Sequence, residues 1–433
     1  MDLSALQIVL IAVTFTVALI GVVLLIRQVR RFWSYFQLGQ PAARNDNPSA
    51  RTMTVLKEFF GHTRMARLPI VAIAHWVTAL AFFLLSATLL NAFFQLIWPD
   101  FRLPVIGHFP PFEWLIEVFA WAGLVGIIAL IVIRQAKHPR SADGEQGRRS
   151  RFFGSIWWQA YYVEFTIVAV TICILLLRTL EAAHVQLTHP ETSIGLHFPL
   201  TGWLAGIWSG LSVEAIETWI IVVAAIKILV SFAWMITISL TPTMGVAWHR
   251  FLAFPNIWFK RFASGRTALG SLQPIRIKGE ELNFEEIEDL DEDAAMGVGK
   301  VEDFTWKGLL DFSTCTECGR CQSQCPAWNT DKPLSPKLLM MALREHANAK
   351  APYLQATEED RASLDAGSVA VAELPLVGST GYDIDRPLTA YQPFSDLEEP
   401  GAVIDEDVIW ACTTCGACVE QCPVDIEHVD HIV

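Results

Sequence analysis

The sequence predicts a mainly α-helical protein, in which a five-helix transmembrane bundle is followed by an α-rich polar domain. Three observations support this: five long apolar runs in the first 240 residues, a change of charge along the chain, and a cysteine motif that occurs twice near the end. Residues 1–266 carry 21 Lys and Arg against 13 Asp and Glu, a formal charge of +8, whereas residues 267–433 carry 11 against 32, a charge of −21. The acidic second half excludes nucleic-acid binding, which needs clustered basic side chains.

Each apolar run is long enough to cross a membrane, because a hydrocarbon core of ~30 Å needs about 20 helical residues. The runs cover about residues 3–26, 68–98, 114–133, 156–180 and 211–240. The first run lacks the basic n-region and the cleavage site of a signal peptide, so we read it as a helix. These features predict a membrane domain over residues 1–266, an acidic linker acting as a solvated tether over 267–304, and a cysteine-bearing domain over 305–433.

The basic residues predict how the bundle is oriented. Segments 27–67, 134–155 and 250–266 carry 8, 6 and 4 Lys and Arg, whereas the opposite loops, 99–113 and 181–210, carry only Arg102. Basic loops stay on the cytoplasmic side of a membrane. We therefore expect a multi-pass protein of the bacterial cytoplasmic membrane, with its N-terminus outside and its cysteine-bearing domain in the cytoplasm.

Eight of the nine cysteines lie in two copies of the motif C-x2-C-x2-C-x3-C-P, at "CTECGRCQSQCP" (residues 315–326) and "CTTCGACVEQCP" (residues 412–423). Three cysteines at two-residue gaps can wrap one [4Fe–4S] cube, which needs four thiolates, one on each iron. A single copy could be a zinc site, although zinc sites more often use two CxxC pairs separated by a longer loop. Disulfides fit this tight spacing poorly. The ninth, Cys173, lies in an apolar run and is expected in the core or facing lipid.

In two-cluster ferredoxins the fourth cysteine of each motif ligates the other cluster. The motif pair therefore predicts a ferredoxin-like fold with two [4Fe–4S] clusters whose ligands cross between the repeats. One cluster is expected to take Cys315, Cys318, Cys321 and Cys422. The other is expected to take Cys412, Cys415, Cys418 and Cys325.

Two histidines are candidate axial ligands of one b-type haem. His75 lies about two turns into the second apolar run, and His249 lies just past the fifth. Because the two helices run in opposite directions, both histidines fall at a similar depth near the cytoplasmic face. The alternative is that each is merely hydrogen-bonded to a neighbour. His62 is a weaker alternative ligand at the same face, and a solvated role is expected for the four histidines outside: His108, His184, His189 and His197.

Glu164 and Lys227 are the deepest charges in the apolar runs. Counting ~1.5 Å per residue from the inner helix ends places them at ~12 Å and ~20 Å, within reach of each other if the lysine extends. Charges inside a membrane are costly, so each needs a reason. The two readings are an ion pair that fixes helix packing and a catalytic role in a proton path or a quinone contact.

The membrane half resembles the cytochrome b subunit (gamma) of respiratory nitrate reductase. "HRFLAFPNIWFKR" is similar to the segment that carries a haem ligand there, and "AHWVTALAFFLL" is similar to its second helix. The resemblance implies a cytochrome b-like bundle with His249 and His75 as axial ligands. That subunit binds a second haem through a histidine about five turns earlier on its last helix. This chain has "KILVSFAW" there, so a single haem is implied.

Such helices followed by two ferredoxin motifs resemble the membrane-bound oxidoreductases that link electron transfer flavoprotein to menaquinone, which are related to heterodisulfide reductase subunits. The resemblance implies that electrons from fatty-acid β-oxidation pass from the reduced flavoprotein, through two [4Fe–4S] clusters and the haem, to menaquinone. Such proteins continue into cysteine-rich domains with CCG motifs, whereas this chain stops 11 residues after Cys422, so we expect that part to be missing or supplied by a partner. Two alternatives are a quinol-oxidising subunit that feeds a heterodisulfide or sulfur-compound reductase, and a membrane redox sensor.

Overall fold

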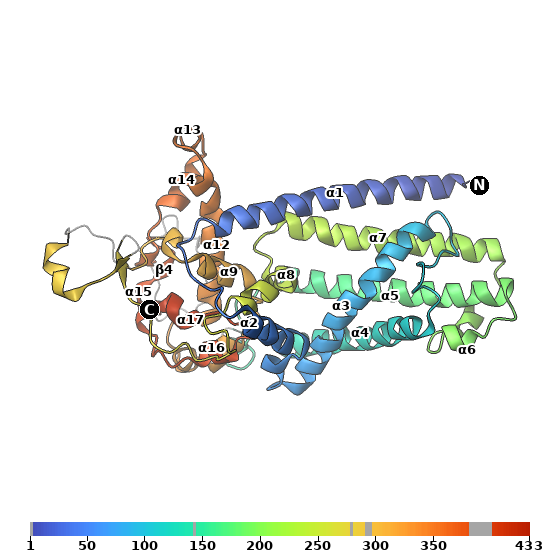
Figure 1. Ribbon diagram of the computed structural model, residues 1–433, viewed down its shortest axis with the longest axis horizontal. Helices are drawn as coiled ribbons and strands as arrows, with labels where there is room; N and C mark the ends of the chain where they lie inside the picture. Colours follow the sequence, from blue (N-terminus) through green and yellow to red (C-terminus); the bar gives the residue numbers. More distant parts are fainter. Residues whose placement is uncertain (1–2, 142–143, 278–279, 291–296, 381–400) are drawn as a thin grey trace. The chain divides into compact units, whose positions relative to one another are not determined.

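The computed structural model describes residues 3–141, 144–277, 280–290, 297–380 and 401–433, so parts of the predicted acidic linker (278–279 and 291–296) lie outside the described residues. The chain forms two compact units (Figure 1). The bundle unit comprises Met1–Gln28, Met65–Gln135 and Trp157–Leu240, and the cysteine unit comprises Val29–Arg64, Ala136–Ile156 and Thr241–Val433. The units do not divide at residue 266, because residues 241–266 and two segments between helices fold with the cysteine motifs.

Five helices, each long and apolar enough to cross a membrane, build the bundle, as the sequence predicts. They are α1 (Ala5–Phe36), α3 (Pro69–Gln95), α4 (Pro110–Ala136), α5 (Trp157–Thr188) and α7 (Val213–Leu240). Prolines begin α3 and α4, where their missing N–H groups cost nothing. α1 and α5 continue ten and eight residues past the predicted ends, because neither extension contains Gly or Pro. The short α6 (Ile194–His197) and a 3₁₀ helix (Gly202–Trp208) lie between α5 and α7.

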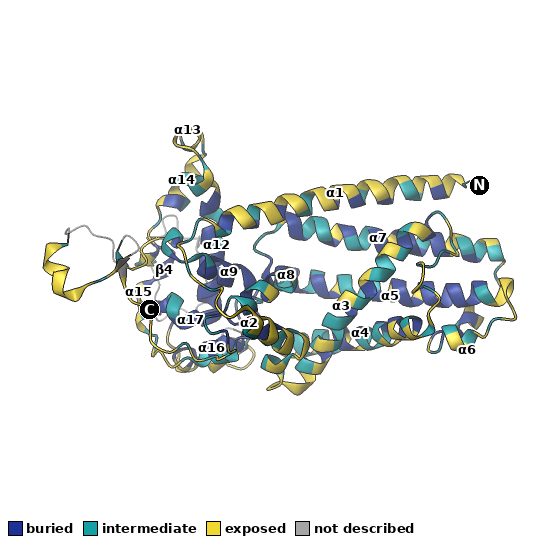
Figure 2. Cartoon of the chain, in the orientation of Figure 1, coloured by how far each residue is buried: buried dark blue, intermediate teal, exposed yellow. Residues whose placement is uncertain are grey.

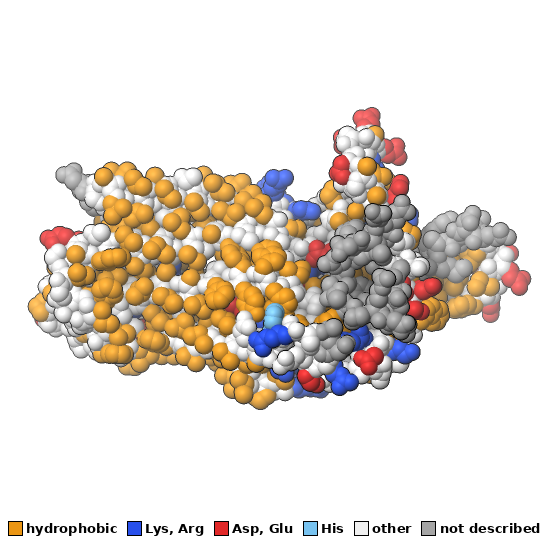
Figure 3. Space-filling model, turned by 180° about the vertical axis from the view of Figure 1, so that it is seen from behind, with side chains coloured by type: hydrophobic (Ala, Val, Ile, Leu, Met, Phe, Trp, Pro, Cys, Tyr) orange, Lys and Arg blue, Asp and Glu red, His pale blue; other side chains and the backbone are white. Residues whose placement is uncertain are grey.

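α5 and α7 form the centre of the bundle unit. α7 packs against both α5 and α3, and 50% of its most apolar window is buried, compared with 17% for that of α1 (Figure 2). Gly126 of α4 lies so close to α3 that a Cβ there would stand 2.8 Å from the Ala74 carbonyl oxygen. Cys173 is buried in this core. The outer faces of the helices are apolar, as a surface in contact with lipid requires (Figure 3).

A buried ionic network joins α4, α5 and the segment before α7. Glu117 of α4 is fully buried, and its carboxylate accepts hydrogen bonds from Leu200 N at 2.7 Å, Thr201 N at 3.0 Å and Thr201 Oγ1 at 2.5 Å. The Arg178 guanidinium of α5 lies 3.0 Å from the same carboxylate and 3.1 Å from Glu181. The network therefore holds the segment that follows α6 against two membrane helices.

We expect Glu117→Ala to lower the free energy of unfolding by about 3 kcal/mol, because it leaves buried donors without an acceptor and removes one partner of a buried charge. Arg178 keeps Glu181, which limits the loss. Thermal unfolding in detergent measures the change. Glu191→Ala is the matched control, since the side chain of Glu191 is 74% exposed and its loss should cost less than about 0.5 kcal/mol. Equal melting shifts for the two variants would contradict the structural role of Glu117.

The cysteine unit is also mainly helical, which confirms the predicted fold class. Its longest helix, α12 (Pro336–Gln355), contains the amphipathic stretch between the two motifs, and Ser335 caps it by accepting a hydrogen bond from Leu338 N. The other α-helices are α2 (Pro48–Val55), α8 (Gly245–Trp258), α9 (Trp306–Thr314), α10 (Arg320–Gln324), α11 (Pro326–Asn329), α13 (Glu358–Arg361), α14 (Ala366–Glu373), α15 (Glu406–Trp410), α16 (Ala417–Gln421) and α17 (His428–Ile432). Among the described residues, the unit also contains two strand pairs, β1 (Arg276–Ile277) with β2 (Glu280–Glu281), and β3 (Val377–Gly378) with β4 (Ile404–Asp405).

Asp311 of α9 ties three helices of this unit together. Its fully buried carboxylate accepts hydrogen bonds from Lys307 Nζ at 2.6 Å, from Asn256 Nδ2 of α8 at 2.8 Å and from His431 Nε2 of α17 at 2.9 Å. Although burial opposes ionisation, Lys307 and His431 hold the pKa of Asp311 well below its usual range. The anion is therefore fully compensated, and α8 is fixed against the helices that flank the cysteine motifs.

Candidate metal centres

The two cysteine motifs adopt the same backbone conformation. Two residues after the first cysteine and one residue after the second, the chain enters the left-handed region: Glu317 (φ 56°) and Gly319 (φ 68°) in the first motif, Thr414 (φ 53°) and Gly416 (φ 73°) in the second. A short helix, α10 or α16, then carries the third cysteine, and the fourth follows in extended conformation. Non-glycine residues rarely adopt positive φ, so the repeated angles indicate one cysteine-binding turn used twice.

The cysteines gather in two groups, each made of three cysteines from one motif and the last cysteine of the other. The first group is Cys315, Cys318, Cys321 and Cys422. The second group is Cys412, Cys415, Cys418 and Cys325, and all four line one pocket. The groups are neighbours, because Cys321 and Cys418 pack in one apolar cluster. The structure thus brings together the same cysteines that the motif spacing groups.

Burial makes these thiols poor anions on their own. It raises the pKa of Cys315 to about 11, that of Cys418 to about 12, and that of Cys321 well above its ordinary value. A bound metal cluster keeps such thiols as thiolates. Backbone N–H groups also point at two sulfur atoms, from Thr414 to Cys412 and from Ile426 to Cys422, both at 3.4 Å.

This donor set fits two [4Fe–4S] clusters, each of which needs four thiolates spread over four irons, and hydrogen bonds to sulfur are typical of such sites. Among the described residues, no three His, Cys, Asp or Glu side chains are arranged to hold a single metal ion. The two findings are compatible, because the four ligands of a [4Fe–4S] cluster bind four separate irons, whereas a single metal ion needs all its ligands around one atom.

The first group is covered by the chain itself. Segment 148–156 lies over it, so that a Cβ on Gly319 would overlap the Arg151 carbonyl oxygen. Ser155 Oγ donates to the Glu317 carbonyl at 3.2 Å, and Ile156 N donates to the Glu317 carboxylate at 3.1 Å. Segment 148–156 therefore contacts both the backbone and the side chain of Glu317 in the turn of the first motif.

The second group is open to solvent at one of its four cysteines, Cys415, whereas Cys325 and Cys418 are buried. At Gly416, the position equivalent to Gly319, a Cβ would have nothing within 4 Å. Cys415 is exposed, and Trp410, two residues before Cys412, is 83% exposed. The exposed thiol of Cys415 makes the second group the more accessible of the two.

His249 lies in α8, within the cysteine unit. Its Nδ1 lies 3.1 Å from the Gly245 carbonyl oxygen one turn earlier, so Nδ1–H donates and Nε2 keeps the lone pair. Burial, and then the neighbouring Arg250, lower the pKa of His249 to about 4, so the ring is neutral at pH 7. A neutral imidazole whose other N–H is held by a carbonyl is the form that binds iron. Gly245 also lies against the first cysteine group, because a Cβ there would overlap the Cys315 carbonyl oxygen.

The other two candidate haem ligands, His75 and His62, lie in different units of the chain. His75 is half-buried in α3 of the bundle unit, whereas His62 belongs to the cysteine unit, within electrostatic range of His249. Burial lowers the pKa of His62. The structure describes the two units separately, so it does not place His75 against either of the others.

The expected solvated role is wrong for two of the outer histidines. His184 lies inside α5, because that helix continues to Thr188, and its Nε2 lies 3.1 Å from Glu217. His197 Nδ1 lies 2.6 Å from Glu113. His189 and His108 are exposed, as predicted.

The expected pairing of Glu164 with Lys227 is also wrong. Arg134 Nε lies 2.6 Å from Glu164, whose second oxygen is buried without a partner among the described residues. Lys227 Nζ donates instead to the Thr88 carbonyl at 2.7 Å and to Thr88 Oγ1 at 2.6 Å, on α3. Counting along a helix gives depth but not the direction in which a side chain points, so the two charges were matched by depth alone.

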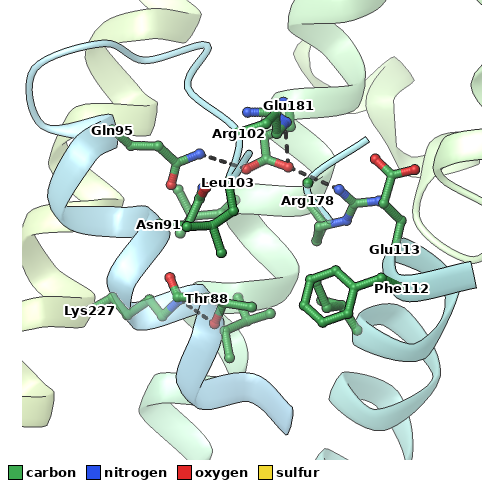
Figure 4. Close-up of a pocket in the computed structure, with 14 residues that line it drawn as sticks. Thr88, Asn91, Gln95, Arg102, Leu103, Phe112, Glu113, Arg178, Glu181 and Lys227 are labelled. Carbon is green, nitrogen blue, oxygen red and sulfur yellow. Dashed lines mark hydrogen bonds and ion pairs between the residues drawn. The ribbon is translucent and has the colours of Figure 1, made fainter. Parts of the chain in front are cut away.

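Lys227 lines a pocket in the bundle unit that the sequence did not indicate (Figure 4). Apolar side chains such as Phe112 share its wall with charged ones. Glu181 accepts from Gln95 at 2.7 Å and from Arg178 at 3.1 Å, and lies 3.6 Å from Arg102. The signal that sequence reasoning missed was the spacing of Arg178 and Glu181, which an uninterrupted α5 places on one face three residues apart.

Comparison with known proteins supports this chemistry. Residues 314–426 match the family described as "4Fe-4S dicluster domain". The chain is 27% identical over 401 residues to "EtfAB:quinone oxidoreductase" of Syntrophomonas wolfei, which covers 90% of the chain and 49% of that protein. It is 25% identical over 426 residues to "Probable iron-sulfur-binding oxidoreductase FadF" of Bacillus subtilis, which covers 95% and 53%. A third relative, "Probable membrane-anchored ferredoxin" of Chromohalobacter salexigens, is 40% identical over 148 residues, covering 34% and 19%.

The chain contains a 4Fe-4S dicluster domain and is similar over most of its length to two proteins named as oxidoreductases. It spans about half the length of the first and of the Bacillus relative. No solved structure matches it. Five helices among the described residues are long and apolar enough to cross a membrane, which is typical of a membrane protein, and one relative is called a membrane-anchored ferredoxin.

Gly319 and Gly416 offer a matched test of the two cysteine-binding turns. Both residues have positive φ, so alanine costs each turn about 1–2 kcal/mol, but only at Gly319 would the new methyl group overlap backbone. We expect Gly416→Ala to retain all of its iron and Gly319→Ala to lose about half, with a lower melting temperature. Iron analysis and thermal unfolding after anaerobic purification measure this. Equal losses of iron in the two variants would contradict the conclusion that the turn at Gly319 is covered by segment 148–156 and the turn at Gly416 is not.

Proposed function

We propose that this chain passes electrons from a soluble cytoplasmic donor, reduced electron transfer flavoprotein, to menaquinone in the membrane. The printed name of the Syntrophomonas relative joins an Etf protein to a quinone, and this is carried over to the present chain as a proposal. The placement of a dicluster domain and five apolar helices in one chain supports it, because one part suits a soluble donor and the other a lipid-soluble acceptor. The basic loops support a cytoplasmic position for the cysteine unit.

The eight motif cysteines would hold two [4Fe–4S] clusters, one in each group. Such clusters, with a b-type haem, supply one-electron carriers whose potentials depend on ligands, hydrogen bonds to sulfur and burial. The chain's own part is to hold the thiolates, to leave the second group open at Cys415 and Trp410, and to cover the first with segment 148–156. This arrangement favours the second group as the one that faces a soluble partner.

The observation that carries the proposal is the contact series His249–Gly245–Cys315. One carbonyl, that of Gly245, fixes the tautomer of His249, while the α-carbon of Gly245 lies against the backbone of a motif cysteine. A candidate haem ligand, His249, and a candidate cluster ligand, Cys315, therefore both contact the same glycine. His75 remains the proposed second axial ligand, and His62 the weaker alternative.

The quinone is proposed to bind at the pocket of the bundle unit. Lys227 supplies an ammonium group there, and two of its N–H donors are directed at Thr88. A quinone carbonyl needs a hydrogen-bond donor, and quinone reduction takes up two protons with two electrons. We propose that the third N–H of Lys227 donates to this quinone carbonyl. Glu164, whose second oxygen is buried, is proposed to act in proton supply.

The function is tested on the anaerobically purified chain, by iron analysis, by the haem absorption spectrum and by reduction of a menaquinone analogue with reduced electron transfer flavoprotein. We expect about eight irons and one low-spin haem per chain. His249→Ala should lose the haem spectrum and quinone reduction but keep the iron, whereas the exposed His189→Ala should keep all three. A chain with full iron and haem that oxidises the quinol but never reduces the quinone would favour the reverse direction and refute the proposal.

Lys227→Met tests the quinone site. It removes a charged hydrogen-bond donor worth about 1.5–3 kcal/mol, so we expect quinone reduction to fall about 10- to 100-fold in kcat/KM while electron transfer from the donor to the iron–sulfur centres continues. Lys227→Arg keeps a charged donor and should retain more activity than the methionine variant. Unchanged quinone kinetics in Lys227→Met would place the quinone elsewhere.

A further inference from the structure

Two fully buried cations lie beside the first cysteine group. Lys337 and Arg344 stand two turns apart on α12, and each is 0% exposed. Lysine and arginine are almost never fully buried unless they are paired. The motif reading of the sequence gave neither residue a role.

Lys337 is held by neutral groups and is directed toward the first cysteine group. Its Nζ donates to the carbonyl oxygen of Phe153, to that of Arg151 at 3.3 Å and to Ser155 Oγ at 3.0 Å. It lies within electrostatic range of the first three cysteines of that group. Carbonyl and hydroxyl oxygens orient the ammonium group but do not cancel its charge.

Arg344 reaches the same group from the next turns of the helix. Its Nη2 lies 2.8 Å from Glu317, and its Nη1 lies 3.4 Å from the Cys315 carbonyl oxygen. Its other carboxylate neighbour, Glu345, is 30% exposed and therefore partly screened by water. Two buried cations thus face one buried carboxylate, that of Glu317, and the local charge is positive.

The nearby acidic residue does not reverse this sign. Asp425 follows Cys422 by three residues, and its two carboxylate oxygens lie 2.9 Å from Arg64 and 2.8 Å from Lys260. Two cations therefore face Asp425, although Lys260 also lies 3.0 Å from Glu58 and Arg64 3.9 Å from Glu420. The second cysteine group differs, because none of the residues lining its pocket carries a charged side chain.

We propose that Lys337 and Arg344 raise the reduction potential of the first [4Fe–4S] cluster, so that this buried site can take an electron from the exposed second site. The inference rests on the proposed function, because it requires both clusters. One-electron reduction adds one negative charge to a cluster, with no bond made or broken and no proton moved. Burial alone opposes that charge, whereas fixed cations in low-dielectric surroundings favour it.

Lys337 also ties segment 148–156 to α12, so an electrostatic role has to be separated from a structural one. Lys337→Gln removes the charge and keeps a donor, and Lys337→Arg keeps the charge. Arg344→Gln removes the second cation independently. Lys332→Gln makes the same change five residues before Lys337, at an exposed position.

The test is a potentiometric titration of the full chain, followed by electron paramagnetic resonance. Cys415→Ser, at the exposed ligand of the second group, identifies which signal belongs to that cluster. We expect Lys337→Gln and Arg344→Gln each to shift the potential of the first cluster downward and to leave the second in place. Lys337→Arg and Lys332→Gln should match the parent chain. The shift should persist at high salt, because buried charges are screened little.

The outcomes separate the two proposals. A parent chain without two cluster signals refutes the proposed function itself. Two intact clusters whose potentials are unchanged in both glutamine variants overturn the inference alone. If Lys337→Gln fails to bind the first cluster, Arg344→Gln decides, and loss of the cluster in both would make the cations structural and also overturn it. A shift of equal size in Lys332→Gln would do the same, since it would show a general effect of net charge.

Discussion

The constraint on which the cysteine unit depends is the exchange of Cys325 and Cys422 between the two repeats. Because each group takes its last cysteine from the other motif, neither group is complete until α10 and α16 lie side by side. The chain from residue 326 to residue 411 must therefore leave the first motif and return to it. This requirement explains why one short turn, repeated with the same dihedral angles, determines the arrangement of a unit of more than 200 residues.

The returning chain is held in place by charges that come from outside the motifs. Asp425 follows Cys422, the last cysteine of the second motif, by three residues, and it forms ion pairs with Arg64 and Lys260. Glu58 joins the same set, and burial beside Asp425 raises the pKa of Glu58 to about 8. These partners come from residues 29–64 and 241–266. Such contacts account for the membership of those segments in the cysteine unit rather than in the bundle.

The sequence was sufficient where a feature depends on local spacing. The motif spacing grouped the eight cysteines as the structure has them, and hydropathy located all five long helices, because both signals are carried by neighbouring residues. Helix ends were less certain: α5 continues past residue 180, so Glu181 and His184 belong to the buried network and not to a loop. Residues 181–188 contain no Gly or Pro to end the helix, but hydropathy alone predicts an end where the residues become polar.

Features that depend on which way a side chain points could not be predicted. Lys227 turns to Thr88 and Glu164 turns to Arg134, although their depths alone suggested a pair. The buried cations of α12 are a similar case. "SPKLLMMALREHA" is typical of an amphipathic helix, but the pattern does not show what its Lys and Arg contact, and only the fold shows that both are buried beside a cysteine group. The sequence shows which polar group a helix carries, but the partner of that group comes from elements distant in sequence.

The position of Gly245 connects these two kinds of feature. A side chain there would overlap the Cys315 carbonyl oxygen and approach Arg344, so α8 can lie against the first motif only with glycine at this place. The same residue's carbonyl oxygen accepts the hydrogen bond of His249. The backbone that fixes a candidate cluster ligand therefore also fixes the tautomer of a candidate haem ligand. A change in the packing of the first motif against α8 would therefore alter the surroundings of both residues at once.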